Sequence, residues 1–461
     1  MVRMILCRYR RRHERGDTVM SRTVVAFALV LLAIAAPVRG SCVGDCNGDG
    51  SVTIDELIVG VNIALGQAAL AACSPLNADG NGEVSIDELV RGVNAAAVGC
   101  PDDSTPTPTT TPVPCVAETR CTVPPGDGVN FDPTQPFCDL LSSYRFFLGN
   151  GAAQEPNAGV LPYDLNTALF SDYAVKHRFV WMPPGTAATY SPRDSFTFPV
   201  GTVIIKTFAF PADYRDPSLG ESELETRLLV RRASGWDAIT YVWKDDQTEA
   251  CRRVIGANIP VTWTQLDGSE RSINYHVPNT NQCKECHEEH NSVMGPLGPK
   301  ARNLNKDHEY ADGSENQLTR WTAVGYLRGA PDPSTAPRAA VFDDPSSGTV
   351  EFRARTYLDV NCGHCHNPSG LARTSGLYLN IDESDPGHLG ICKPPVAAGH
   401  GSGDLKVDIY PGGPDLSILS YRMESTMAGV AMPELGRQTA HEEALSVINE
   451  WIAGLTPPGC D

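Results

Sequence analysis

The sequence lacks a hydrophobic run long enough to cross a membrane. Its most apolar run, TVVAFALVLLAIAA at 23–36, has about 14 residues, whereas a membrane-spanning helix needs roughly 20. A basic segment precedes this run, and together the two have the form of a secretory signal peptide. We therefore expect residues 1–40 to be a signal peptide that begins at Met1 or Met20, and the mature protein to be periplasmic or extracellular.

Positive charge is scarce as well. The chain has 37 Lys and Arg against 55 Asp and Glu, which gives a formal net charge of −18. Because residues 1–40 hold eight Arg against Glu14 and Asp17, their removal changes the net charge from −18 to −24. Such acidity argues against nucleic acid or an anionic membrane as a partner, and it favours a soluble protein that docks on a basic surface.

Cysteine, in contrast, is abundant, with 15 copies. In an exported chain these residues form disulfides, bind metals or carry haem. Cys7 lies in the predicted signal peptide, and four others form two CxxC pairs. The remaining cysteines can form up to five disulfides, whose pairing the sequence leaves open: Cys42, Cys46, Cys73, Cys100, Cys115, Cys121, Cys138, Cys251, Cys392 and Cys460.

An internal repeat with a period of 32 residues fills most of 41–100. DCNGDGSVTIDEL at 45–57 recurs as NADGNGEVSIDEL at 77–89. Each copy fits a twelve-residue calcium loop, with oxygen ligands at alternate positions, glycine at position six and Glu at position twelve. The predicted ligands are Asp45, Asn47, Asp49, Ser51 and Glu56 in loop one, and Asn77, Asp79, Asn81, Glu83 and Glu88 in loop two. Loop two should bind more weakly, because Asn77 replaces an acidic ligand.

The paired loop-and-helix units resemble dockerin modules, although Glu56 and Glu88 stand where dockerins usually carry Asp. The resemblance implies a calcium-binding module with a cohesin-like scaffold as its candidate partner. The segment PDDSTPTPTTTPVP at 101–114 is rich in Pro and Thr and cannot form a core. We expect it to be a linker to the rest of the chain.

Residues 115–280 form short runs of β-branched and aromatic residues, which predict strands. The runs are FTFPVGTVIIKTFAF (196–210), TRLLVRR (226–232), WDAITYVW (236–243) and IPVTWT (259–264). Ser234 and Gly235 indicate a hairpin turn, and the regular spacing predicts an antiparallel sandwich. The region has no pairing of nucleophile and base, so we assign it no catalytic residue. His177 and His276 are expected to be packed or surface residues.

Two CxxCH pentapeptides follow, CKECH at 283–287 and CGHCH at 362–366. In this motif two thiols add across the haem vinyl groups, and the adjacent His ligates the iron. The predicted attachment residues are Cys283, Cys286 and His287 for haem one, and Cys362, Cys365 and His366 for haem two.

Two other chemistries compete with haem. CGHC alone has the form of a redox dithiol, but such a dithiol lies at the end of a strand in a βαβ unit. TVEFRARTYLDVN at 349–361 instead has the period of a helix. A zinc site would need a matching second pair at shorter range. We therefore favour haem at both motifs.

Residues 346–461 have the pattern of a small helical haem domain. After Cys362 come AMPELGR at 431–437 and then an apolar helix, for which Thr439 and Glu442 fit a capping box. This order resembles a class I cytochrome c, which implies Met432 as the distal ligand of haem two, with Met427 next. Ligation by His and Met raises the reduction potential and leaves no open position on the iron.

The first haem region, 281–345, departs from this pattern. Pro278 prevents a regular helix from leading into Cys283, and Met294 lies too near His287 in sequence to reach the opposite side of the haem. The remaining candidates for a second ligand are His276, His290, His308 and Lys300. The alternative is an open coordination position.

Over roughly 137–455 the chain resembles a family of bacterial two-haem c-type cytochromes. The likeness rests on NQCKECH (281–287), GPLGPKARNLN (295–305), ENQLTRW (315–321), VNCGHCHNPSGLARTSGLYLN (360–380) and MPELGR (432–437). It implies two covalent haems in one exported protein that passes electrons. The matching residues are Cys283, Cys286 and His287 for one haem, and Cys362, Cys365, His366 and Met432 for the other.

The expected fold is therefore multidomain: a small α calcium-loop module, a β-rich sandwich-like middle and an α-helical cytochrome c-like C-terminal haem domain. The leading functional hypothesis is a secreted electron carrier with two haems c and calcium, which docks on a redox partner through that partner's basic face. The enzymatic alternative is a di-haem peroxidase-like oxidoreductase with an open haem-one site. A third alternative is a scaffold-attached binding module.

Overall fold

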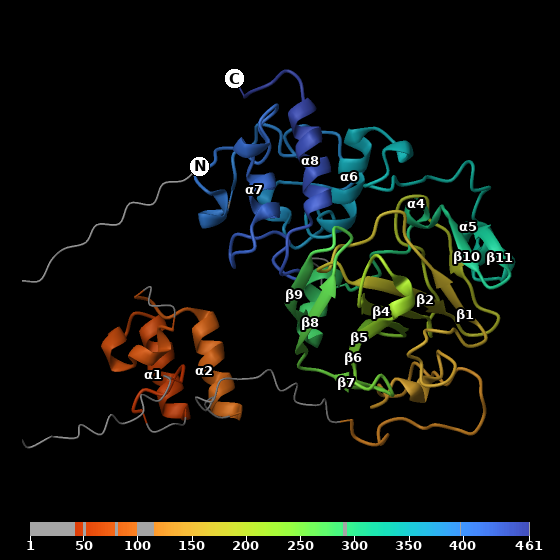
Figure 1. Cartoon of the computed structure of the whole chain (residues 1–461), viewed down its shortest axis with the longest axis horizontal. Coiled ribbons are helices and arrows are strands. Elements are labelled where there is room, and N and C mark those ends of the chain that lie inside the picture. Colours follow the sequence, from red (N-terminus) through yellow and green to blue (C-terminus); the bar gives the residue numbers. More distant parts are fainter. Residues whose placement is uncertain are drawn as a thin grey trace, which may run out of the picture. The chain divides into compact units, whose positions relative to one another are not determined.

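The computed structural model (Figure 1) describes residues 42–48, 52–78, 82–98, 115–288, 293–396 and 398–460. The chain divides into two compact units, Met1–Thr107 and Pro108–Asp461. Several predicted features lie outside the described residues: the signal peptide, the linker 101–114, His290, and the loop residues Asp49, Ser51, Asp79 and Asn81.

The first unit contains one helix after each predicted calcium loop, α1 (Ile54–Ala64) and α2 (Ile86–Val98). The two helices approach closely at Gly60, where a Cβ atom would lie 2.8 Å from Leu89 Cδ2. A larger residue would therefore force the helices apart, because close-packed interiors have no room to spare. The Cys46–Cys73 disulfide ties the first loop to the segment between the helices.

The second unit is built around one antiparallel sheet of six strands, in the order β1-β2-β4-β5-β6-β7 (Figure 1). Its strands are β1 (Val160–Tyr163), β2 (Val175–Trp181), β4 (Val203–Pro211), β5 (Glu221–Arg232), β6 (Gly235–Trp243) and β7 (Ala250–Arg253). Arg232 pairs with Gly235 across a two-residue turn, so β5 and β6 form the predicted hairpin.

The remaining strands form smaller pairs around this sheet. They are the hairpins β8 (Ala257–Thr264) with β9 (Glu270–Val277) and β10 (Asp307–Tyr310) with β11 (Gly313–Asn316), and the parallel pair β3 (Ala188–Thr189) with β12 (Leu327–Arg328). The helices of this unit are α3 (Thr280–His287), α4 (Ala301–Leu304), α5 (Gln317–Ala323), α6 (Val350–Asn361), α7 (Ile418–Glu424) and α8 (Glu442–Gly454).

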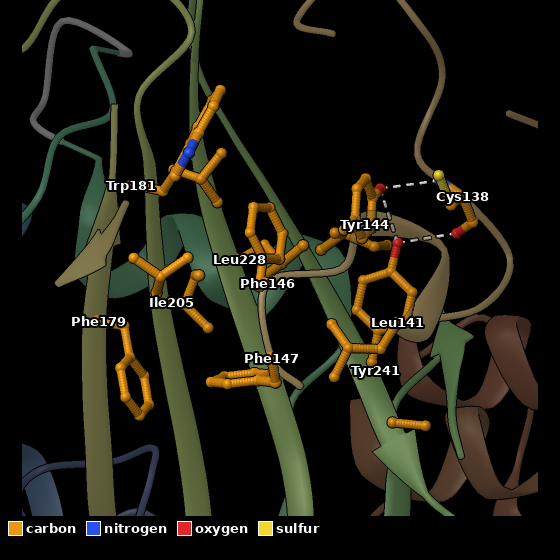
Figure 2. Packing of buried hydrophobic residues seen from close by; sticks show 14 of the residues in the cluster. Cys138, Leu141, Tyr144, Phe146, Phe147, Phe179, Trp181, Ile205, Leu228 and Tyr241 are labelled. Carbon is orange, nitrogen blue, oxygen red and sulfur yellow. Dashed lines mark hydrogen bonds between the residues drawn. The ribbon is translucent and has the colours of Figure 1, made fainter. Parts of the chain in front are cut away.

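One face of the sheet is covered by the segment that precedes β1. Side chains alternate along a strand, and Ile205 and Leu228 point to this face, where they are fully buried against Phe146 (Figure 2). Tyr241 Oη donates a hydrogen bond of 2.8 Å to the Cys138 carbonyl, which pins the covering segment to β6.

The opposite face carries two apolar clusters with a polar gap between them. Ile204 packs in a cluster with α4 and α5, and Phe208 packs in a second cluster with the β8–β9 hairpin. Lys206 lies between these two residues on β4 and shares their face. The gap between the clusters opens onto a large cavity that Lys206 lines.

The prediction of a helical cytochrome c-like domain at 346–461 is wrong. Helices α6, α7 and α8 have only 12, 7 and 13 residues. Between Cys362 and Ser417 the described chain forms no α-helix. The physical reason is the repeated Pro and Gly of this stretch, as in DPGHLGICKPP at 385–395 and YPGGP at 410–414, since both residues destabilise helix interiors.

The middle of the chain is β-rich, as predicted, but it is not a sandwich of two sheets. The hairpin β8–β9 is a separate two-stranded pair that packs beside the six-stranded sheet through Trp263 and Tyr275. The predicted strand 196–210 is also shorter than expected, because β4 begins only at Val203.

Candidate functional site

A large cavity, called here the shared cavity, lies between the polar gap of the sheet, helix α3 and the C-terminal helices. About 1960 Å³ of non-atom space, open solvent included, lies within it. Cys283, Cys286 and His287 line it from α3, and Cys362 lines it from the end of α6. Two motifs that are far apart in sequence thus open onto one space.

The two CxxCH motifs also touch each other. Cys365 Sγ lies 3.6 Å from the carbonyl oxygen of Glu285, in the middle of CKECH. Groups attached to the two motifs would therefore be neighbours.

The thiols of these motifs differ from every other described cysteine in being free. Cys283, Cys286, Cys362 and Cys365 are free, and the other described cysteines are disulfide-bonded. Four bridges join described partners: Cys46–Cys73, Cys115–Cys251, Cys121–Cys138 and Cys392–Cys460. Such a number of disulfides is typical of a protein that folds in an oxidising compartment.

The surroundings of the second pair do not suit redox dithiol chemistry. Burial, and then the neighbouring Cys365 thiol, raise the pKa of Cys362 to about 12, whereas a reactive dithiol needs a lowered thiol pKa. Cys362 also follows helix α6 rather than a buried strand.

His287 is held in one orientation by a hydrogen bond. Its Nδ1 donates a hydrogen bond of 2.9 Å to the carbonyl oxygen of Gly295, which fixes the tautomer and leaves Nε2 as the atom with a lone pair. Burial, with smaller contributions from nearby Lys206 and Arg227, lowers the pKa of His287 to about 4 against the opposing effect of the Gly295 carbonyl. The ring is therefore neutral at physiological pH.

The second motif contains two half-buried histidines, His364 and His366, whose Nδ1 atoms are buried. Neither Nδ1 atom has a hydrogen-bond partner, although the Leu377 carbonyl lies close enough to His366 to oppose the lowering of its pKa by burial. His364 lines the shared cavity. Burial, and then the nearby His287 ring, lower the pKa of His364 to about 4 against the opposing effect of the Val360 carbonyl.

Met432 lines the shared cavity in a loop that one arginine holds in place. The Arg437 guanidinium donates hydrogen bonds of 2.7 to 3.1 Å to the carbonyl oxygens of Arg422, Ser425, Met432 and Thr439. Met427, the other sequence candidate, is 66% exposed and does not line the cavity.

The sequence candidates for the second ligand of haem one are scattered. His276 and Lys300 line the shared cavity, but His276 already hydrogen-bonds to Asn258 at 2.9 Å and to Gln282 at 3.2 Å. His308 lies on β10 and is not among the residues that line the cavity.

Sequence reasoning missed His364, Lys206 and Arg437 as residues of this site. His364 had a signal, because it lies inside CGHCH itself. No sequence signal marked Lys206 or Arg437 as a site residue, because each reaches the cavity through the packing of distant segments.

Glu56 and Glu88 are the residues at position twelve of the two predicted calcium loops, and they occupy equivalent positions in the first unit. Glu56 Oε1 accepts hydrogen bonds from the backbone N–H groups of Cys46 and Asn47 at 2.9 and 3.2 Å. Glu88 Oε1 accepts one from Ala78 at 2.7 Å. Both carboxylates are buried, and each reaches back to the start of its own loop.

A third cluster of ligand-type side chains does not suit a metal. Ligand atoms of Glu118, Cys121 and Cys138 lie within 4.8 Å of one another. However, Cys121 and Cys138 form a disulfide with each other, so neither sulfur is a thiolate.

None of the helices in the described part of the chain is both long and apolar enough to cross a membrane. A scan against protein-family models matches no family, and searches of the curated proteins and of the solved structures find no similar protein.

Proposed function

We propose that the protein is an exported electron carrier that binds two haems c covalently in the shared cavity. One observation carries the proposal: among the described residues, the only free thiols are those of the two CxxCH motifs, and the two motifs touch each other. Cys283, Cys286 and Cys362 line one cavity, whereas Cys365 and His366 are not among its lining residues. Covalently bound haem supplies reversible one-electron transfer. The oxidising compartment implied by the disulfides supports a periplasmic or extracellular location.

The residues of both motifs fit this group. Each thiol adds across a vinyl double bond: sulfur bonds to one carbon and the hydrogen goes to the other, so no oxidant is needed. His287 offers Nε2 as the proximal ligand of haem one, and His366 takes the same role for haem two. Met432, held by Arg437 on the cavity wall, is the second ligand proposed for haem two.

His364 is the residue we propose as the second ligand of haem one. It lines the same cavity as His287, and its buried Nδ1 has no hydrogen-bond partner. The contact between Cys365 and Glu285 joins the two motifs beside these rings. Protein ligands on both sides of the iron leave no position for peroxide, which favours electron transfer over the peroxidase alternative.

Spectroscopy of the oxidised, haem-loaded chain tests this proposal. We expect two low-spin haems that do not bind cyanide. The His364→Ala variant should keep two haems but gain one high-spin, cyanide-binding haem, whereas the matched His276→Ala variant should resemble the wild type. A high-spin, cyanide-binding haem in the wild type would instead support the peroxidase.

For the first unit we propose calcium as the ligand of both loops. The equivalent placement of Glu56 and Glu88 at the starts of their loops supports this role. Calorimetric titration of the full chain with calcium is the test, and absence of any binding heat would refute the proposal.

A further inference from the structure

Three basic side chains stand side by side on the wall of the shared cavity. Arg178 on β2 pairs in register with Lys206 on β4, which pairs in register with Arg227 on β5. All three line the cavity. We call these three residues the cation row. Like charges directly opposite each other on neighbouring strands are destabilising, so the row has to be offset by negative charge.

The flanking carboxylates form ion pairs only with the two ends of the row, although Glu225 also opposes the lowering of the Lys206 pKa. Arg178 Nη1 donates to Asp164 Oδ1 at 2.8 Å, and Arg227 forms a two-point ion pair with the fully buried Glu225.

Lys206, in the middle, has no hydrogen-bond or ion-pair partner within the part of the chain that the structure describes. Its ammonium lies 4.6 Å from the centre of the Phe208 ring. Burial, and then Arg178 and Arg227, hold the pKa of Lys206 well below its usual range. An anion in the cavity would offset each of these effects.

The cavity wall as a whole also has more basic than acidic residues. Its basic residues are the cation row, Lys300 and Arg437, and its single carboxylate is Asp359, which is already paired with Arg302 at 3.0 Å. This excess of positive charge occurs in a chain whose formal net charge is −18. The cavity wall therefore has an excess of basic residues in an acidic protein.

We infer that the cation row binds the propionate carboxylates of haem one. This inference rests on the proposed function, because it assigns the anion to a haem attached at Cys283 and Cys286. The row lines the same cavity as Cys283, Cys286 and His287, so a haem attached at these residues would lie in the cavity that the row faces. Positive charge there also stabilises the reduced haem, so the row raises the reduction potential of haem one.

Removal of the central charge tests this inference. Haem-loaded full-length protein is compared with its Lys206→Gln and Lys206→Arg variants by haem counting and by potentiometric titration of each haem. Lys206→Gln should keep two haems but lower the midpoint potential of haem one. We expect about a tenfold change in the ratio of oxidised to reduced haem one at fixed potential, which corresponds to ~59 mV for one electron.

The controls separate charge from structure. Lys206→Arg should restore the wild-type potential, since it restores the charge. Lys244→Gln removes the same charge from an exposed residue paired with Asp246, and both potentials should stay unchanged. Two haems with an unchanged potential in Lys206→Gln would overturn the inference, whereas a wild type without haem would overturn the proposed function instead.

The alternative ligand of the cation row is a free carboxylate in place of the haem propionates, and acetate is the probe for this alternative. If propionates fill the row, added acetate should leave the potential of haem one unchanged in the wild type. A potential that responds to acetate in the wild type but not in Lys206→Gln would assign the row to a free anion and overturn the propionate assignment.

Discussion

The ion pair between Arg302 and Asp359 joins the two haem-motif regions, and its loss should destabilise the second unit. Arg302 lies on α4, and Asp359 lies on α6 directly before the second motif. Nη2 and Nε of Arg302 lie 3.0 and 3.2 Å from Asp359 Oδ2, and the two side chains are only 10% and 5% exposed. Asp359 Oδ1 also accepts a hydrogen bond of 3.0 Å from the Ile381 N–H.

Asp359→Asn keeps the shape of the side chain but leaves the Arg302 charge buried and unpaired. Removal of one partner from a buried ion pair costs about 3–5 kcal/mol, so we expect the free energy of unfolding to fall by that amount. Arg302→Met should lower it by a similar amount. The double variant should lose less than the sum of the two, because it leaves no unpaired charge.

Denaturant unfolding followed by tryptophan fluorescence measures this loss. All six tryptophans lie in the second unit, so the signal does not report on the first unit. Asp312→Asn is the matched control, because the Arg320–Asp312 pair is largely exposed on the Asp312 side and should change stability little. A loss below about 1 kcal/mol in Asp359→Asn would refute the reasoning.

Three further predictions concern pH, calcium and the Met432 loop. Burial lowers the pKa of His441 to about 3, against about 6.5 when unfolded. Below about pH 7 the unfolded state therefore binds a proton that the folded state does not bind. The free energy of unfolding should fall by about 2 kcal/mol from about pH 7 to about pH 5, and denaturant titrations of the His441→Asn variant should lack that part of the loss. Glu56→Gln keeps a residue suited to the capping box but removes a charge, so calorimetry should show at least about tenfold weaker calcium binding at loop one. Arg437→Lys cannot reproduce the forked hydrogen bonds to the Met432 loop, so the His–Met spectrum of haem two should be lost while two haems remain attached; an unchanged spectrum would contradict the role of Arg437.

Local patterns in the sequence predicted the elements that depend on local packing. The helix before Cys362 is an example: α6 buries Ala354, Tyr357 and Leu358 on one side, as their helical spacing predicts. The β5–β6 turn is another, because its strands are neighbours in sequence.

The predicted cap of the last helix failed because of a contact between distant segments. Thr439 was expected to cap the last helix, but its hydroxyl lies 3.0 Å from Asp172 Oδ1, and α8 begins at Glu442 without a side-chain cap. Asp172 belongs to the middle of the chain, so no local pattern could reveal this competing partner.

The candidate site was predictable only in part, for a similar reason. The CxxCH motifs carry their chemistry in five consecutive residues and were evident from the sequence. The cation row depends on the register of three strands, and register follows from tertiary packing rather than from spacing along the chain. The sequence therefore indicated the residues proposed to attach the haems but not the side chains that line the cavity beside them.

The most direct test of two covalent haems is a pyridine haemochrome assay on the full chain, produced in a host that attaches haem c. We predict two haems per chain in the wild type. One haem should remain when Cys283 and Cys286 are both replaced by Ser, and one when Cys362 and Cys365 are. A wild-type value near zero would contradict the central claim.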